Sequence, residues 1–294
     1  MSVLPAPVPA APLDAVARRR RLRGVRGLPL SVKIGAGIVA LLVLAAVFGP
    51  LLSPYGQDQL DFANQSASPS LSHPFGTDDT GRDVFTRALF GLRTDLGVAL
   101  LITYIAVPIG ILAGAVAGFF GGWVDAVISR VVDVVVAIPF VVLVLAIVAI
   151  VGPGLKGVMI GVPLAGWALY ARLARAEMLV LREQPFMLAT TALGYTRRRA
   201  MFRHAIPNLI RSSLIYSTVD LVVNLLLLAS LSYLGLGAQP GTASLGKVIA
   251  DGQSVLLDAW WVATLPGLML VLFGVGVGLI GDGLSDGKLR GGRT

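Results

Sequence analysis

The sequence predicts an all-α membrane protein with six transmembrane helices and both termini in the cytoplasm. Of its 294 residues, 55% are hydrophobic and only 14% are charged. The mean hydropathy of +0.81 is far above that of soluble globular domains. Several apolar runs match the ~20 residues that cross ~30 Å of hydrocarbon. Arginines gather in alternate connections between these runs, which is the pattern that keeps basic loops inside the cell.

The charge balance and the residue types exclude several classes of function. A net charge of +8 in a soluble chain would suggest nucleic acid as the partner. Here arginine blocks alternate with apolar runs, so a membrane is expected and nucleic acid is not. The chain has no cysteine, which excludes a disulfide and a thiolate metal site. His73 and His204 lie too far apart in sequence to indicate a metal site, and we expect none.

The N-terminal part predicts a basic tail and then the first span. Residues 1–33 are rich in proline and alanine and then in arginine, so they are expected to form a disordered cytoplasmic tail. Residues 34–52 are uncharged and long enough to form the first transmembrane helix. A signal peptide is the alternative, but this apolar core is longer than usual and no small-residue cleavage site follows it.

Residues 53–93 are expected to form an external segment with a short interfacial helix. Aspartates outnumber arginines in this segment, which suits the side opposite to the arginine-rich loops. Residues 79–90 carry charges of both signs and enough apolar residues for one helical face. From these residues alone, the helix is interpreted as a solvated connector.

Residues 94–286 are expected to form a core of five helices. The second span, near residues 96–120, carries three glycines at four-residue spacing: Gly110, Gly114 and Gly118. This spacing places the glycines on one helical face, where bare backbone allows another helix to approach closely. We interpret the three glycines as packing positions.

The third span, near residues 128–151, contains Asp133, and Arg130 lies one helical turn earlier. A carboxylate near a membrane edge is costly unless it is paired or faces protein. A structural ion pair between the two side chains is the simpler interpretation, because residues three apart are neighbours on a helix. A direct substrate or proton site at Asp133 is the alternative.

The remaining spans lie near residues 158–173, 212–232 and 262–281. The fifth span contains Asp220 and Asn224, which are one helical turn apart. Polar side chains within a span face other helices or a water-filled path rather than lipid, so both are possible intramembrane polar sites. Residues 287–294 are basic and are expected to form a cytoplasmic tail.

The segment 181–210 is the most polar and basic connection of the core, and we expect it to be cytoplasmic. It should form two short helices with a break at Gly194, where glycine permits a backbone that other residues resist. Pro207 should then limit continuation into the fifth span. The first helix has an apolar face that could enter a groove of a partner, formed by Phe186, Ala189 and Leu193. A basic loop that only holds topology and touches anionic lipid is the alternative.

Residues 241–248, GTASLGKV, nearly match the phosphate-binding loop of nucleotide-binding proteins. The match fails at Val248, which has no hydroxyl for magnesium, and the segment does not lie between a strand and a helix. Nucleotide binding by this segment is therefore rejected.

Four blocks in order resemble one family of membrane proteins. The segment 181–210 resembles the EAA loop of the inner-membrane permeases of binding-protein-dependent ABC importers, although Leu188, Ala189 and Thr190 stand where Glu-Ala-Ala is usual. The block GTDDTGRDVFTR and the run RVVDVVVAIPF are similar to blocks of the dipeptide, oligopeptide and nickel branch. The external loop also resembles the family, with departures at Gly241 and Leu245.

This resemblance implies a C-type permease subunit with the type I ABC importer permease fold in a bacterial inner membrane. It implies a non-catalytic chain that forms half of a path for dipeptides or oligopeptides. The implied partners are a homologous second permease subunit, two ATPase domains that hold ATP and magnesium, and an extracytoplasmic binding protein. The residues implied in ATPase coupling are Phe186, Leu188, Ala189, Thr190, Leu193, Gly194, Arg198 and Pro207.

Three alternatives to peptide import remain at this stage. The same architecture serves importers of nickel or of another peptide-like solute. A secondary transporter would usually show internal repeats and broken helices with polar midplane sites, and no convincing repeat is found. A membrane-embedded enzyme would need clustered reactive side chains, and the few candidates in the spans do not cluster in the sequence.

The topology gives a first prediction. In this cysteine-free chain, a Ser66→Cys variant should react with an impermeant thiol reagent added from outside, because residues 54–91 are expected to be external. The unaltered chain is the control and should not react. Labelling that needs access from the cytoplasmic side would reverse the assignment.

Overall fold

The protein is a bundle of long helices in which one span is broken. The computed structural model describes residues 29–291 and contains no strand within that range. In these residues, five helices are long and apolar enough to cross a membrane, and a bent helix pair makes a sixth. The six predicted spans are therefore confirmed as five continuous helices and one interrupted one. Residues 1–28 of the predicted tail lie outside the described residues.

The first half of the chain supplies three of the spans. Helix α2 (Leu30–Leu52) leads through a loop with the short helix η1 (Phe62–Asn64) into α3 (Val84–Phe120). Helices α4 (Gly122–Ala137) and α5 (Phe140–Val151) follow and meet at an angle of 89°.

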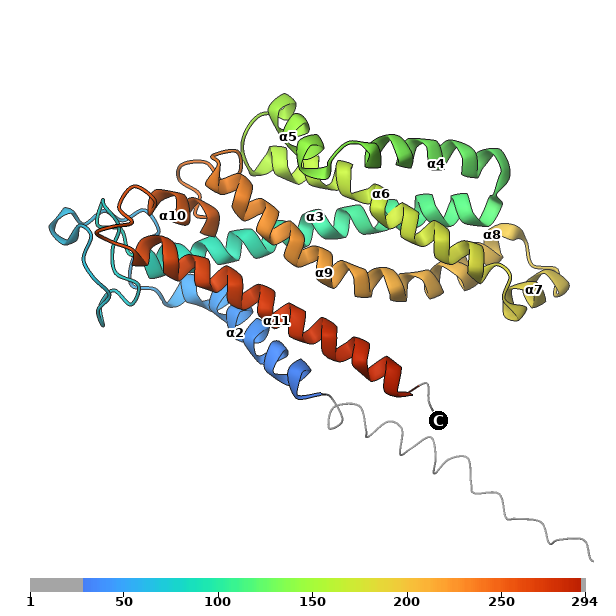
Figure 1. Cartoon of the computed structure of the whole chain (residues 1–294), viewed down its shortest axis with the longest axis horizontal. Coiled ribbons are helices and arrows are strands. Elements are labelled where there is room, and N and C mark those ends of the chain that lie inside the picture. Colours follow the sequence, from blue (N-terminus) through green and yellow to red (C-terminus); the bar gives the residue numbers. More distant parts are fainter. Residues whose placement is uncertain (1–28, 292–294) are drawn as a thin grey trace, which may run out of the picture.

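The second half supplies the other three spans and the short helices that lie at the two ends of the bundle. Helix α6 (Leu155–Leu181) leads to α7 (Pro185–Ala192), α8 (Arg197–Ala200) and the π-helix η2 (Met201–Ala205). The chain then forms α9 (Ile206–Tyr233), α10 (Leu245–Asp251) and α11 (Trp261–Gly291). In Figure 1, α10 and the loop before α3 lie at one end of the bundle, and α7 and α8 lie at the other.

Three expected boundaries are wrong, and the first of them is the start of the first span, which lies at Leu30 rather than at residue 34. The interfacial helix expected at 79–90 does not exist as a separate element, because α3 begins at Val84 and continues into the second span. The carboxylate of Asp83 caps this helix by accepting a hydrogen bond from the amide of Thr86 at 2.7 Å. The expected tail at 287–294 is also wrong in part, since α11 continues to Gly291.

The third span is interrupted between α4 and α5. Ile138 is extended, and Pro139 precedes the first residue of α5. Proline disfavours a helical conformation for the residue before it and has no amide hydrogen to donate, and both effects favour a break at this point. The break directs Phe140 and the rest of α5 away from the axis of α4.

Helix α3 packs along α6 more extensively than any other pair of described elements. At Gly114, an added Cβ would lie 2.8 Å from both the Cβ of Ala174 and the amide nitrogen of Arg175. At Gly118, it would lie 2.8 Å from the Cβ of Met178. The interpretation of the glycines as packing positions is confirmed, because any side chain on this face would push α6 away.

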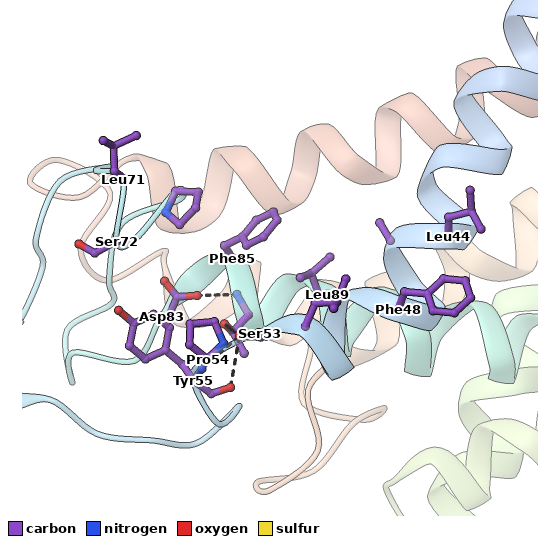
Figure 2. Close-up of a pocket in the computed structure, with 15 residues that line it drawn as sticks. Leu44, Phe48, Ser53, Pro54, Tyr55, Leu71, Ser72, Asp83, Phe85 and Leu89 are labelled. Carbon is purple, nitrogen blue, oxygen red and sulfur yellow. Dashed lines mark hydrogen bonds between the residues drawn. The ribbon is translucent and has the colours of Figure 1, made fainter.

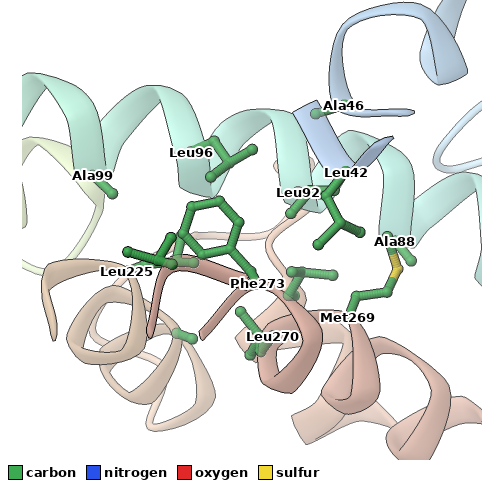
Figure 3. Packing of buried hydrophobic residues seen from close by; sticks show 13 residues of the cluster. Leu42, Ala46, Ala88, Leu92, Leu96, Ala99, Leu225, Met269, Leu270 and Phe273 are labelled. Atoms are coloured by element: carbon green, nitrogen blue, oxygen red, sulfur yellow. The ribbon is translucent and has the colours of Figure 1, made fainter. Parts of the chain in front are cut away.

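A buried apolar cluster joins α3 to the outer helices α2, α9 and α11. Phe273 of α11 is almost fully buried and lies among leucines of the other three helices (Figure 3). The cluster includes Leu42, Leu92, Leu96, Leu225, Met269 and Leu270. Helix α2 lies alongside α11 in Figure 1, so the first span is attached to the core through this helix.

The glycine seam gives the second prediction. Gly114→Ala should lower the free energy of unfolding by about 1–3 kcal/mol, because the added methyl overpacks the contact with α6. Gly97→Ala in the same helix is the control, since nothing lies within 4 Å of its added Cβ. Thermal unfolding in detergent measures both. Equal melting temperatures for the two variants would contradict a tight seam.

Candidate functional site

The segment predicted to couple to a partner forms a helix, a tight turn and a second helix. Helix α7 ends in a turn in which the amide of Tyr195 donates to the carbonyl of Thr190 at 3.0 Å. Gly194 occupies the left-handed region at φ +71°, and nothing lies within 4 Å of an added Cβ. Glycine is therefore required here for its backbone conformation and not for lack of space. The predicted break at Gly194 is confirmed.

The side chains of α7 divide into an inner and an outer face. Met187 and Thr190 are buried, and the hydroxyl of Thr190 donates to the carbonyl of Met187 at 2.7 Å. The outer face is apolar and exposed; it is formed by Phe186, Leu188 and Ala189 and continues into Leu193, which directly follows the helix. Of the residues predicted for coupling on this helix, Thr190 thus serves internal packing and the others face outward.

The expectation that Pro207 limits continuation into the next span is wrong. The helical backbone runs without interruption from Arg197 through η2 into α9. In η2 the turn is widened, so the amide of Ile206 donates to the carbonyl of Met201, five residues back. The wider π-turn leaves space for the proline ring, which would clash in a regular turn. It also changes the hydrogen-bond register where Pro207 has no amide hydrogen to donate. Arg198 lies exposed in the first turn of this continuous helix.

The expected ion pair between Arg130 and Asp133 is also wrong. The carboxylate of Asp133 pairs instead with Arg172 of α6 at 3.1 Å, and both side chains are more than half exposed. One turn away, Arg175 donates two hydrogen bonds to Asp125, one of them at 2.7 Å. Because α4 packs against α6, arginines of α6 come closer to these carboxylates than a neighbour on the same helix does.

The predicted polar pair of the fifth span joins three helices. Asp220 accepts hydrogen bonds at Oδ2 from the hydroxyl of Tyr170 at 2.8 Å and from the side-chain amide of Asn224 at 3.0 Å. That amide also donates to the hydroxyl of Thr103 at 2.9 Å. Sequence reasoning missed Tyr170 and Thr103, because they lie in other spans and only packing brings them to α9.

The end of the bundle that carries α10 and the loop before α3 holds a buried charge network, where the sequence led us to expect a solvated connector. Asp78 accepts hydrogen bonds at Oδ2 from Arg82 and Arg87, both at 2.8 Å. Arg87 also donates to Asp251 of α10 at 2.7 Å. Burial opposes ionisation of Asp78, but hydrogen bonds from Thr80 and Arg82 and two arginine charges outweigh it and hold its pKa below the ordinary value.

Two further contacts fasten the segments at this end to the spans. The indole of Trp261 donates to the carbonyl of Thr77 at 3.2 Å, and the amide of Leu245 donates to Asp95 at 2.8 Å. Within the segment 241–248, Gly246 lies directly against the backbone of Ala229. That glycine therefore serves helix packing and does not form a phosphate cradle.

An apolar groove of about 400 Å³ lies beside this network, between the outer end of α2 and the start of α3. Figure 2 shows Phe48, Phe85 and Leu89 along its wall, with Tyr55 and Asp83 at its polar end. Asp83 pairs there with His73 at 3.0 Å. Among the described residues, no three side chains of the types that ligate metals converge here or elsewhere.

Comparison with known proteins gives consistent results over most of the chain. Residues 106–287 match the family described as the binding-protein-dependent transport system inner membrane component. Residues 32–69 match the N-terminal TM domain of oligopeptide transport permease C.

Two relatives and one solved structure extend this result. The chain is 35% identical to the probable D,D-dipeptide transport system permease protein DdpC of Escherichia coli, over 89% of this chain and 88% of the relative. It is 36% identical to the dipeptide transport system permease protein DppC of Alkalihalophilus pseudofirmus, over 86% and 83%. A chain of the inward-facing MetNI methionine ABC transporter has the same fold, with a TM-score of 0.54 at 18% identity over 67% of this chain and 93% of that one.

The charge network around Arg87 gives the third prediction. Arg87→Met should destabilise the protein by about 3 kcal/mol or more, because it removes the buried cation that contacts both Asp78 and Asp251, while Arg82 approaches Asp251 only to 3.7 Å. Arg82→Met is the matched control and should cost about 1 kcal/mol, since the side chain of Arg82 is 21% exposed and that of Arg87 is 3% exposed. Unfolding followed by tryptophan fluorescence measures both, and equal losses would contradict a network centred on Arg87.

The same network should depend on pH in one direction. The pKa of Asp78 is lowered from its ordinary value of 3.8 in the folded protein. Its contribution to stability is therefore complete above that ordinary value and is lost as the pH falls through the folded value. In acid, the difference in stability between the unaltered protein and Arg87→Met should shrink.

Proposed function

The chain belongs to the family of inner membrane components of binding-protein-dependent transport systems, and from this premise we propose that it is the permease subunit of an ATP-driven importer of dipeptides or oligopeptides. It would form half of the translocation path and would be inserted in the bacterial inner membrane. The proposal rests on the family match together with relatives that carry peptide-transport names over more than four fifths of both chains.

Peptides are favoured over nickel as the imported solute. The relatives at 35% and 36% identity are named for dipeptide transport, and the N-terminal match is to an oligopeptide permease. A secondary transporter is not supported, because the family is defined by dependence on a binding protein.

The assembly proposed for the chain has three kinds of partner. A homologous second permease subunit would complete the path, and two ATPase domains would bind at the end that carries α7 and α8. An extracytoplasmic binding protein would deliver the peptide to the opposite end. In this assembly ATP and magnesium belong to the ATPase subunits, and the chain itself is non-catalytic and binds no cofactor.

The coupling surface is proposed as the outer face of α7 together with the turn at Gly194. The exposed side chains of Phe186, Leu188 and Leu193 form an apolar face at a polar end of the bundle, which suits insertion into a groove of a partner. Contact with anionic lipid is the alternative, because a basic helix with an apolar face also binds at a membrane surface. Since Leu188 replaces the usual glutamate, we propose that apolar contact carries the docking.

The continuous helix behind this surface supplies the route for coupling. Movement of α7 and its turn would act on α8, and the helical backbone from Arg197 onward leads without a break into α9. A rigid element joined to two sites can transmit a displacement from one to the other. Closure of the ATPases would in this way move the span that carries Asp220.

The proposed function is tested by transport. The complex reconstituted in proteoliposomes should take up labelled dipeptide only when both ATP and the binding protein are present.

The turn at Gly194 gives the fourth prediction. Gly194→Val should reduce that uptake at least fivefold, because a β-branched residue resists the left-handed backbone by about 1–2 kcal/mol. Purification of the ATPase subunits with the permease, ATP hydrolysis and uptake are measured together.

A matched variant separates the hinge from the alternatives. Gly194→Asn should retain most of the uptake, since asparagine tolerates the left-handed region. If valine and asparagine both behave as the unaltered protein does, the turn is not a coupling element and lipid contact suffices. Absence of ATP-dependent uptake of any peptide by the unaltered complex would refute the proposed function itself.

A further inference from the structure

Only one of the two oxygens of the Asp220 carboxylate accepts hydrogen bonds from described residues. Tyr170 and Asn224 both donate to Oδ2, and no described residue donates to Oδ1. Within the described part of the chain, no lysine, arginine or histidine pairs with this carboxylate. A carboxylate among transmembrane helices without a countercharge is expensive, and such groups usually mark a functional path.

The position of Asp220 is fixed by the fold. It lies within the apolar part of α9, which extends from Ser212 to Tyr233. The hydrogen bonds from α6 and from Asn224 hold the carboxylate in one orientation, and Thr103 of α3 anchors Asn224 in turn. A carboxylate locked in this way keeps its free oxygen in a constant place, as a binding group requires.

A cavity of about 200 Å³ lies against Asp220 between α3, α5, α6 and α9. Phe140 stands on its wall because the break at Pro139 begins α5 there, and Tyr216 and Leu169 add further apolar surface. The surrounding face of α9 exposes Val219 and Val223. If lipid covered this face, hydrocarbon would contact the ionisable group of Asp220, which is energetically costly. We therefore expect water or protein to cover this face.

We propose that Oδ1 of Asp220 is the counter-ion for the α-ammonium group of a peptide in transit, and that the cavity receives the first residue of that peptide. The inference rests on the proposed function and adds a specificity-determining residue to it. An organic ammonium group fits a site with one carboxylate and aromatic walls, because it gains both a charged hydrogen bond and contact with ring faces. A metal ion fits less well, since no group of three His, Cys, Asp or Glu side chains that could hold one exists among the described residues.

The single free oxygen also suits transport. A group in transit must bind well enough to enter and weakly enough to leave. One charge-assisted hydrogen bond in a small cavity provides moderate affinity, whereas a closed set of ligands would trap the peptide. Selection of the peptide as a whole remains with the binding protein in this proposal.

The test compares Asp220→Asn with Asp220→Glu in the reconstituted complex. Asparagine keeps an acceptor for Tyr170 and Asn224 but removes the charge, so uptake of a dipeptide with a free amino group should fall about tenfold. Glutamate keeps the charge and should retain much more of the uptake. ATP hydrolysis stimulated by the loaded binding protein should persist in both variants, because delivery and coupling are untouched.

Thr103→Val provides the matched structural control. It breaks the outer end of the hydrogen-bond network but leaves Asp220 and the cavity in place, so it should reduce uptake less than Asp220→Asn does. Equal losses of uptake in these two variants would show that Asp220 serves only to hold the helices together. Unchanged uptake by Asp220→Asn would also overturn the inference. The inference would also be overturned if the Asp220→Asn permease no longer purified with the second permease subunit. That result would show that Asp220 pairs with a cation of that subunit and not with the peptide. All three outcomes are distinct from failure of the proposed function, in which the unaltered complex itself takes up no peptide.

Discussion

The close contact between α3 and α6 is the interaction on which the other features of this protein depend. Gly110, Gly114 and Gly118 leave one stripe of the second half of α3 without side chains, so the backbone of α6 can lie directly against it. Apolar side chains gain little from leaving lipid for another helix, and van der Waals contact between close backbones must hold the pair. With α6 in this position, Tyr170 reaches Asp220 of α9, while Arg172 and Arg175 reach the carboxylates of α4.

The two ends of the bundle are built on different physical principles. The end that carries α10 is fastened by buried charges, in which Arg87 joins the loop before α3 to α10. Such a network fixes one arrangement, because each charge is costly without its partner. The opposite end has an exposed apolar helix, one glycine turn and a π-turn, with no buried ion pair among its described residues. It is the end at which a partner can bind and move the chain.

Coupling and passage are brought together in one helix under the proposed function. The backbone that begins after the turn at Gly194 becomes α9, and α9 carries the carboxylate that lines the cavity. A displacement at the cytoplasmic end would therefore reach the polar group of the path without crossing a flexible joint. The π-turn before Pro207 is the point at which this helix departs from regular geometry, and such turns often occur at functional positions.

The sequence by itself determined the class of the protein, the number of spans, the glycine face of α3 and the break at Gly194. These features depend on the composition of one segment or on the backbone preference of one residue, and both are local properties. Only the tertiary structure decided the partners of the charged and polar groups. Arg130 lies one turn from Asp133, yet the pair is made by Arg172, and Tyr170 and Thr103 join Asp220 and Asn224 from other helices. Spacing along the chain gives neighbours on the same helix, whereas the contact between helices is set by which faces pack together, and that depends on all of them at once.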